Sequence, residues 1–542
     1  MKLNKNQKLR QEQKLRRRRS YCKQRNVSRY ARRRNEHNRE KARWKFYSRN
    51  EKKVAQELRE GRATCGAGTG WGFFDKFYIF LWNMGFFAIL EKVEGDGYER
   101  VLISVAKLLL TYSIKILLGI SSLNKVPYLL FREIALLQLI GFTALEIKEG
   151  VCHRGKGKSQ PMHKDTVGDF LARLTEKEVE YILNASVKLL SQKRFLKSST
   201  FILDSTDLFL PRQIEGSGCK KYKEYKYDRK EKKRIEFEVI RFGFKLIVLL
   251  EAKSMIIVAA KFAKINEHES NYTLPLLDQA RKNIGNHKIK LLLIDNAFMD
   301  GQTLWKIKKR YKINFIVRVR TTMDIAADAR SMREMKPDND TLFYGEAKEY
   351  GKKMKVMGMP YLTSYDQYGD ESHVQKKNRK NLKANPINAV MVLCWDDKEY
   401  LPGQEPVFIT GLKVNDPLDI INKYDLRSLI ENCCFRELKQ GWNLGKFCKK
   451  TFEAIRSHSI LTAVMFSLNA AFQSQQGKSI TRKGIRRLRD EDMHSIHKVA
   501  IFADDYFGIF DIEEILIINR APPRDFFRIN PDEAKKRLGL KD

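Results

Sequence analysis

IKLLLIDNAF at residues 289–298 and SSTFILD at residues 198–204 are the two segments that decide the fold class. Each contains a short run of apolar and β-branched residues, which is typical of a strand buried in a sheet. Each run ends in an acid, Asp295 in the first segment and Asp204 in the second. The sequence therefore predicts two strands, each with a carboxylate at its end.

The segments around these strands alternate between strand and helix patterns. Apolar residues at helical spacing predict two helices, and short apolar runs predict three further strands. The predicted helices are 271–284 and 301–311, and the predicted strands are 242–251, 255–262 and 315–319. This order of elements predicts an α/β fold with a mixed sheet.

Residues 321–406 interrupt the alternation, because they contain no long helical pattern. Short alternating segments there are separated by Gly, Pro, Asn and Asp. A loop of about 85 residues without secondary structure is improbable inside a compact domain, so we expect a β-rich insertion. A strand at 407–410 and helices at 418–440 and 454–473 are predicted to follow it.

The chain of 542 residues carries 104 Lys and Arg against 65 Asp and Glu, a formal net charge of +39. Residues 1–53 contain 22 of the basic residues and four Glu, so +18 of this charge lies in the first tenth of the chain. Basic residues with interleaved aromatic residues are typical of nucleic-acid binding, although a solvated tail is the alternative. We expect a DNA-binding arm whose contacts include Arg16, Arg17, Arg18, Arg19, Arg32, Arg33 and Arg34.

Two more basic segments are KKYKEYKYDRKEKKR at 220–234 and RKGIRRLR at 482–489. The first lies between two strand-like segments and predicts a protruding hairpin or loop. For both segments, contact with DNA and a solvated surface remain open interpretations.

The composition excludes several classes of protein. The mostly apolar, uncharged stretches 77–90 and 134–145 are too short for the roughly 18–20 residues of a spanning helix. Charges throughout the first 50 residues argue against a signal peptide. The eight cysteines include no Cys-x-x-Cys pair, which argues for reduced thiols. We therefore expect an intracellular, cytoplasmic protein with no membrane partner.

Three acids stand out: Asp204, Asp295 and Glu431, the last in the predicted helix 418–440. Acids near strand ends in an α/β sheet can gather at one edge, where they repel each other unless cations lie between them. Mg²⁺ suits such oxygen ligands, and two ions can promote phosphoryl transfer. Any one of these acids alone is more often a cap, a role that fits Asp207 and Asp300 better.

These neighbourhoods resemble the DDE transposases of bacterial insertion sequences, in the group with a Tyr-x2-Arg-x3-Glu-x6-Lys signature. Tyr424, Arg427 and Glu431 match its first three positions. Matches to the family's other motifs extend over roughly 130–475; they are Asp204-Ser-Thr, Gly243-Phe-Lys245, Asp295-Asn-Ala-Phe298 and FIVRVR at 315–320. The resemblance implies a ribonuclease-H-like fold and metal-dependent excision and integration of a DNA element.

The signature lysine departs from this pattern. Its position seven residues after Glu431 is Leu438, and Lys439 is one residue later. On a regular helix Lys439 would lie about 80° from Glu431, off the shared face. A π-bulge near residues 432–434 would absorb the extra residue and return Lys439 to that face.

The resemblance and the chemistry together suggest roles for these residues. Asp204, Asp295 and Glu431 would ligate two Mg²⁺, for which Mn²⁺ is an acceptable substitute. Four residues, Tyr424, Arg427, Arg436 and Lys439, would contact DNA phosphates, although Tyr424 could equally be a packing residue. His268 is a weaker candidate, since it could be a satisfied surface group.

The resemblance implies cleavage at the ends of an insertion sequence and strand transfer into target DNA. We expect a homodimer to carry out these reactions on double-stranded DNA. The resemblance also implies a location in the bacterial cytosol, associated with the nucleoid. A structure-specific nuclease and a DNA-binding protein without catalysis are the alternatives.

The expected domain order begins with the basic arm at 1–53 and an α-helical N-terminal domain at 54–190. A catalytic domain follows at 191–320 and 416–500, interrupted by the β-rich insertion at 321–415. A C-terminal segment at 501–542 completes the chain.

Overall fold

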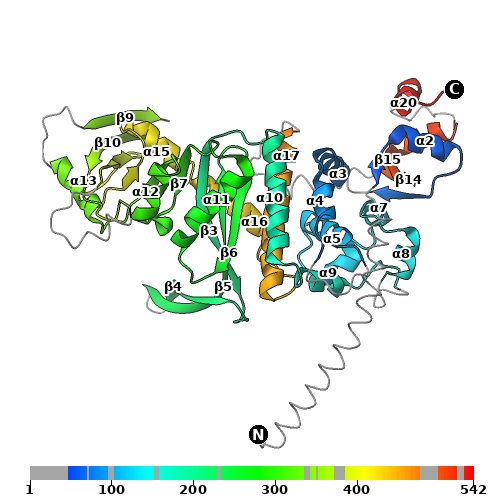
Figure 1. The fold of residues 1–542 in the computed structure, drawn as a ribbon, viewed down its shortest axis with the longest axis horizontal. Coiled ribbons are helices and arrows are strands. Elements are labelled where there is room, and N and C mark those ends of the chain that lie inside the picture. Colours follow the sequence, from blue (N-terminus) through cyan, green and yellow to red (C-terminus); the bar gives the residue numbers. More distant parts are fainter. Residues whose placement is uncertain are drawn as a thin grey trace, which may run out of the picture. The chain divides into compact units, whose positions relative to one another are not determined.

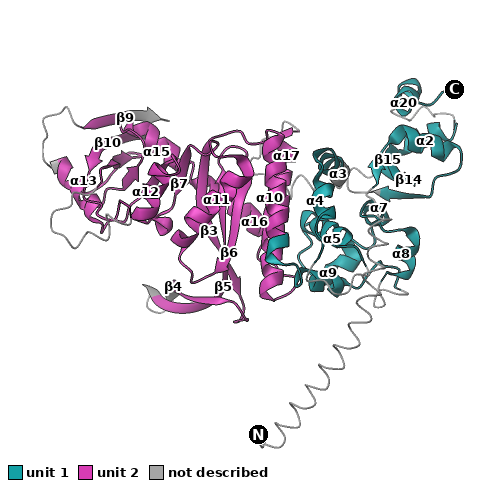
Figure 2. Cartoon of the chain, viewed as in Figure 1, with its two compact units in different colours: residues 1–178, 487–542 teal, residues 179–486 magenta. Residues whose placement is uncertain are grey.

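The computed structural model describes residues 47–69, 72–95, 103–151, 158–228, 233–334, 342–349, 352–370, 385–475, 498–521 and 530–541. The chain forms two compact units, residues 1–178 with 487–542 (unit 1) and residues 179–486 (unit 2), shown in Figure 2. The arginines predicted for the basic arm, and the basic segment 482–489, lie outside the described residues.

Unit 2 is built on one sheet of eleven strands (Figure 1). The strands follow the order β4-β5-β3-β7-β8-β13-β11-β10-β9, with β6 paired to β5 and β12 paired to β11. Their bounds in chain order are β3 Thr200–Leu210, β4 Gly218–Asp228, β5 Lys233–Glu251, β6 Ile257–Lys264, β7 Leu291–Ile294, β8 Asn314–Arg318, β9 Phe343–Glu349, β10 Lys352–Leu362, β11 Ile387–Trp395, β12 Lys398–Glu399 and β13 Val407–Thr410.

The sheet is mixed, as the sequence predicts. β3, β7 and β8 pair in parallel, whereas the other strands pair antiparallel. All four residues of β7, LLLI, are buried, as expected for a central parallel strand covered on both faces. The predicted β-rich insertion continues the same sheet, because β13 bridges β8 to β11.

Helices complete unit 2, and several of them pack against the sheet. They are α10 Glu176–Gln192, which begins at the boundary of the unit, α11 Thr273–Ile284, α12 Gly301–Lys309, α13 Asp324–Glu334, α15 Pro417–Asp425, α16 Arg436–Gln440 and α17 Phe452–Gln475. The Asp300 carboxylate caps α12 by accepting from the Thr303 N–H at 2.9 Å, so its predicted capping role is confirmed. Helix α13 is missing from the sequence prediction, which assigned only strands to this region.

The predicted hairpin at 220–234 is confirmed by β4 and β5, which pair from Gly218↔Gly243 out to Asp228↔Lys233. Oppositely charged side chains form ion pairs across this ribbon, at 3.1 Å for Lys221–Glu238 and 2.7 Å for Lys223–Glu236. Part of the basic charge of the segment is therefore compensated within the hairpin itself.

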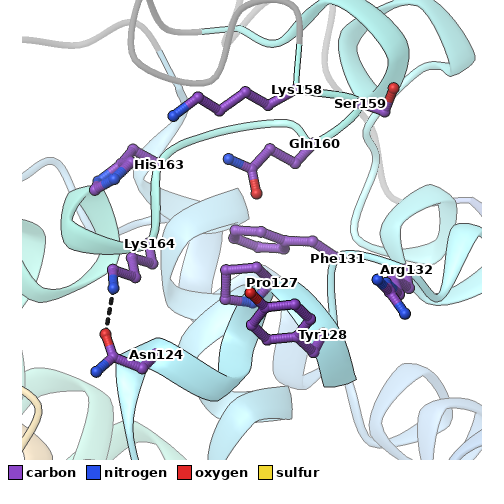
Figure 3. A pocket seen from close by; sticks show the side chains of 10 residues that line it. All are labelled: Asn124, Pro127, Tyr128, Phe131, Arg132, Lys158, Ser159, Gln160, His163 and Lys164. Atoms are coloured by element: carbon purple, nitrogen blue, oxygen red, sulfur yellow. Dashed lines mark hydrogen bonds between the residues drawn. The ribbon is translucent and has the colours of Figure 1, made fainter.

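Unit 1 combines helices with a small sheet. Its helices are α2 Glu51–Arg59, α3 Gly72–Met84, α4 Phe86–Glu91, α5 Val105–Leu117, α6 Val126–Leu129, α7 Ile134–Leu139, α8 Ala144–Glu149, α9 Lys164–Leu171, α19 Ile512–Ile518 and α20 Pro531–Leu538. Figure 3 shows a cavity lined by residues of α6 and of the start of α9. No helix in the described ranges is both long and apolar enough to cross a bilayer.

The sheet of unit 1 joins the two ends of the described chain. Its order is β1 (Ser48–Arg49), β15 (Tyr506–Asp511), β14 (Lys498–Ala503) and β2 (Cys65–Thr69). The buried residues beside it come from both ends of the chain, and they include Val54, Ala55, Ile501, Phe510, Ile518 and Leu538. The boundaries that we expect for a C-terminal segment, 501–542, remain a prediction.

Replacing Phe510 with Ala should destabilise unit 1 by about 3–5 kcal/mol, because the fully buried ring would leave a cavity between the two ends of the chain. Urea denaturation followed by hydrogen exchange in β14 and β15 measures this loss. Ile512→Ala is the control, since that side chain is 49% exposed and should change stability little. Equal effects of the two substitutions would contradict the prediction.

Candidate active site

The pairing of β3 with β7 places two of the predicted acids side by side. The two strands run parallel, and their last pair is Leu203 with Ile294. Asp204 and Asp295 are the next residues on these neighbouring strands, so the backbone carries both carboxylates to one position of the sheet.

The prediction that Asp204 ends its strand is wrong. β3 continues to Leu210, because β5 pairs antiparallel with it from Phe201↔Glu251 to Leu210↔Phe242. Asp204 therefore lies within a strand, 7% exposed, and is held more firmly than a residue in a loop.

Glu431 lies in a π-helical turn, Ile430–Phe435, between α15 and α16. The predicted π-bulge near residues 432–434 is confirmed. The wide turn accommodates one additional residue, and beyond it Leu438 is fully buried while Lys439 is exposed. Lys439 lies close enough to Asp207 for their charges to interact.

Arg427 is the centre of the acidic site. Its Nη1 lies 3.0 Å from Asp204 Oδ2 and 3.5 Å from Asp295 Oδ1, and its Nη2 lies 3.0 Å from Glu431 Oε1. One guanidinium thus contacts all three acids. Arginine suits this role, because its planar fork presents several donors and stays protonated.

These contacts neutralise only part of the negative charge. The pKa of Asp204 is raised to about 7, mainly by burial and to a lesser extent by the charges of Asp295 and Glu431. The N–H of Ser205, which donates to Asp204 Oδ1 at 2.7 Å, and the Arg427 guanidinium act in the opposite direction. Arg427 alone therefore does not bring the pKa of Asp204 back to its ordinary value of 3.8. Further cationic charge beside the carboxylate would lower this pKa.

The three carboxylates around Arg427 are the candidate ligands for a metal ion. Among the residues that the structure describes, no group of three or more His, Cys, Asp or Glu side chains is close enough to hold a metal ion. The three carboxylates nevertheless converge on one cation, the guanidinium, and they are the hard oxygen donors that Mg²⁺ prefers.

Tyr424 is half-buried one helical turn before Arg427. Its ring packs edge-on against Phe408 at a centroid distance of 4.8 Å, which supports the packing interpretation. Burial raises its pKa to about 12, and the neighbouring Asp295 charge contributes to this shift. The hydroxyl is thus protonated and near the acids. Arg436 is exposed at the start of α16.

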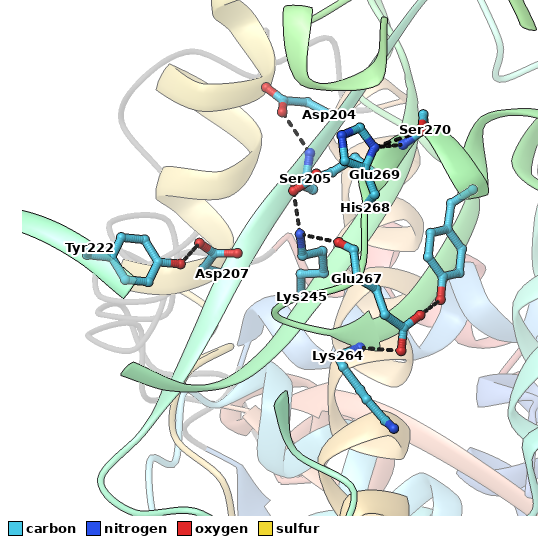
Figure 4. Close-up of polar contacts among 11 residues, drawn as sticks. Asp204, Ser205, Asp207, Tyr222, Lys245, Lys264, Glu267, His268, Glu269 and Ser270 are labelled. Atoms are coloured by element: carbon cyan, nitrogen blue, oxygen red, sulfur yellow. Dashed lines mark hydrogen bonds and ion pairs between the residues drawn. The ribbon is translucent and has the colours of Figure 1, made fainter. Parts of the chain in front are cut away.

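A second polar cluster joins Lys245 of β5 to residues 267–269, which follow β6 (Figure 4). Lys245 is 1% exposed; its Nζ donates to the Glu267 carbonyl oxygen at 2.9 Å and pairs with the Glu269 carboxylate. The Lys245 ammonium holds the pKa of Glu269 below its usual range, against the effect of burial. The role of Glu269 was missed from sequence, although a lysine inside the apolar run FGFKLIVLL signals a buried partner.

Two minor expectations can also be compared with the structure. Asp207 caps no helix but accepts a hydrogen bond from the Tyr222 hydroxyl, so its expected capping role is wrong. His268 caps the 3-10 turn Glu269–Tyr272, with its Nδ1 accepting from the Ser270 N–H at 3.3 Å. This local contact is what a satisfied surface histidine makes.

A mixed sheet with acids gathered on its central strands and on a following helix defines the class of DDE-type phosphoryl-transfer enzymes. The family described as "Transposase DDE domain" matches residues 196–468, half of the chain, and the chain belongs to this family. The function of this protein is that of a DNA transposase. The family match thus confirms the resemblance to DDE transposases that the sequence shows.

Among solved structures, the chain is similar to a piggyBac transposase in a synaptic complex with hairpin DNA, determined by cryo-EM. Its sequence identity to the chain is 7%, with a TM-score of 0.34 over 86% of this chain and 85% of that chain. No curated protein matches the chain.

Asp204→Asn should raise the melting temperature of metal-free protein at pH 8 more than at pH 5. A carboxyl with a folded-state pKa of about 7 and an ordinary pKa of 3.8 destabilises the fold increasingly as pH rises between those values. The amide removes this cost, which is on the order of 2–4 kcal/mol at pH 8. Thermal melting in EDTA at the two pH values measures the effect.

Asp425→Asn is the matched control, because this exposed carboxylate at the end of α15 lies outside the cluster. A gain for Asp204→Asn that is equal at both pH values would contradict the raised pKa.

Proposed function

We propose that this DNA transposase cuts the ends of an insertion sequence and joins them to target DNA by metal-dependent phosphoryl transfer at Asp204, Asp295 and Glu431. The observation that carries the proposal is the convergence of these three acids, from β3, the end of β7 and the π-helical turn, on the single guanidinium of Arg427. A cluster of acids from distant segments around one partly buried cation is typical of a functional site that binds cations.

The donor set favours Mg²⁺, with Mn²⁺ as a substitute, and the three carboxylates would hold two ions. When bound, two such ions activate the attacking water or 3′-hydroxyl and stabilise the leaving oxygen. Because Arg427 lies between the carboxylates in this structure, we infer that its side chain turns away when the cations enter.

Once turned away, Arg427 presents its fork to a phosphate of the bound DNA, where two parallel hydrogen bonds fix orientation. Lys439, exposed beyond the π-helical turn, supplies a second positive charge, and Arg436 a third. Surrounding protein atoms lower the pKa of Lys439, with Asp207 partly offsetting this effect. The protonated Tyr424 hydroxyl is available as a donor to the same strand.

Double-stranded DNA is the proposed partner, both as element ends and as target. The net charge of +39 supports this, since Lys and Arg that neutralise phosphates release counterions. We also propose that the protein acts as a homodimer on DNA, because two ends must be cut and joined. Its proposed location is the cytoplasm. The DNA-binding arm at 1–53, the helical domain at 54–190 and the interrupted catalytic domain remain our proposed division of the chain.

Asp204→Asn and Asp295→Asn should each reduce Mg²⁺-dependent strand cleavage by more than about 100-fold while leaving DNA affinity within about twofold. We propose that the acids act in catalysis and not in DNA binding, so the cleavage rate should fall while the DNA affinity stays nearly the same. A nicking assay on labelled element ends and fluorescence anisotropy measure them.

Asp425→Asn should retain cleavage and serves as the control. Unchanged cleavage by either active-site variant would refute the assignment of the acids. Wild-type protein that binds but never cleaves would indicate a DNA-binding protein without catalysis. Cleavage without strand transfer into a target plasmid would indicate a nuclease.

Arg427→Ala should tighten Mn²⁺ binding to DNA-free protein by about tenfold, because the acids lose the cation that competes with the metal. The same variant should cleave DNA more slowly, because the phosphate contact is lost. Electron paramagnetic resonance titration of free Mn²⁺ gives the affinity without reference to activity.

Arg436→Ala is the matched control, since Arg436 is exposed and is not among the cations that contact the three acids. It should leave Mn²⁺ affinity unchanged. Weaker Mn²⁺ binding by Arg427→Ala would show that the arginine supports the metal site and does not compete for it.

A further inference from the structure

Unit 1 contains a cavity of about 760 Å³ that plays no part in the acidic site (Figure 3). One wall comes from the turn and helix that include Asn124 and Tyr128, and continues to Phe131 and Arg132. The other wall comes from residues 158–164, which lead into α9. Its size falls within the range of about 300–1,000 Å³ of small-ligand sites.

The lining is cationic. It includes Arg132, Lys158 and Lys164 together with His163, and it includes no Asp or Glu. Asp165 lies next to the cavity, where its carboxylate is 3.4 Å from His163 Nδ1. Three positive charges without an acid among the lining residues favour an anionic ligand.

The cavity also has an aromatic surface. The Tyr128 ring is 65% exposed, whereas Phe131 beside it is 2% exposed and forms part of the core. The Arg132 guanidinium lies 5.4 Å from the centroid of the Tyr128 ring, a cation–π contact that restrains both side chains. An exposed, restrained tyrosine is a platform on which a planar group can stack.

One contact between the two walls holds Lys164 in place, and a local contact holds His163. The Lys164 ammonium donates to Asn124 Oδ1 on the opposite wall. His163 caps α9, its Nδ1 accepting from the Asp165 N–H at 3.3 Å. Ser159 has a left-handed φ of 50°, a conformation that costs about 1 kcal/mol or more and is often found where a ligand is held.

We propose that this cavity binds one unpaired nucleotide of a DNA strand, with its phosphate against Arg132, Lys158 and Lys164 and its base stacked on Tyr128. The proposal rests on the proposed DNA transposase function and adds a binding site to it. A nucleotide in a strand is favoured over a free one, because Tyr128, Arg132 and Lys158 are exposed at the rim and a continuing backbone can pass them.

The test compares a blunt duplex with the same duplex carrying one unpaired nucleotide, using fluorescence anisotropy of the full chain. Tyr128→Ala should weaken binding to the unpaired-nucleotide DNA about tenfold and binding to the blunt duplex less than twofold. Arg132→Gln with Lys158→Gln should weaken binding to the unpaired-nucleotide DNA by about 10- to 100-fold and lower the slope of log affinity against log salt by about 1–2.

The matched controls are Tyr344→Ala, which removes a 59% exposed tyrosine from unit 2, and Lys148→Gln, which removes an exposed charge from α8. Neither should change affinity by more than about twofold. Thermal melting checks that each variant is folded. As a direct readout, 5-iododeoxyuridine at the unpaired position should crosslink to Tyr128, which mass spectrometry identifies.

Unchanged affinity and salt slope in the cavity variants would overturn the proposal, as would an equal loss on both DNAs with Tyr128→Ala. Binding of free deoxynucleoside monophosphate as tightly as the DNA would also overturn it, in favour of a small-molecule site. None of these results affects the cleavage assay with the Asp204 and Asp295 variants. Wild-type protein that binds no DNA would refute this proposal and the proposed function together.

Discussion

The contact between Arg427 and the three acids is the interaction on which the proposed chemistry depends. Parallel pairing of β3 with β7 places Asp204 and Asp295 on adjacent strands, where two like charges a few ångströms apart would repel each other. Arg427 offsets that repulsion, and Glu431 lies one turn further along the same helical segment. In the proposed reaction, metal ions would take the place of this guanidinium between carboxylates that the sheet and the helical segment already bring together.

The π-helical turn Ile430–Phe435 solves a problem of spacing on the helical segment that carries Glu431. Lys439 is eight positions after Glu431, and on a regular helix that spacing turns the lysine away from the acid. The wide turn absorbs one residue, so Leu438 faces the core while Lys439 stays exposed near Asp207. The π-helical turn thus departs from regular helix geometry, but it lets Leu438 pack in the core and leaves the positive charge of Lys439 exposed.

The two candidate sites of the protein carry opposite kinds of charge. Unit 2 gathers carboxylates on its sheet, whereas unit 1 contains a cavity lined by three cations and a tyrosine. Arg427 is the exception, and its contact with the acids is the one that we expect DNA and metal to change.

Much of the catalytic unit could be predicted from the sequence by itself, because strand runs, helix periodicity, the Asp300 cap and the extra residue before Lys439 are local patterns. The tertiary structure decided what depends on distant segments. Arg427 and Asp204 are 223 residues apart, and nothing in local spacing reveals that the arginine would contact the acids and not only a phosphate. The extension of β3 beyond Asp204 required the long partner β5, and helix α13 formed where short-range signals suggested only strands. The sheet that unites β2 with β14 and the cavity beside Tyr128 likewise arise from contacts between separate segments, which periodicity does not encode.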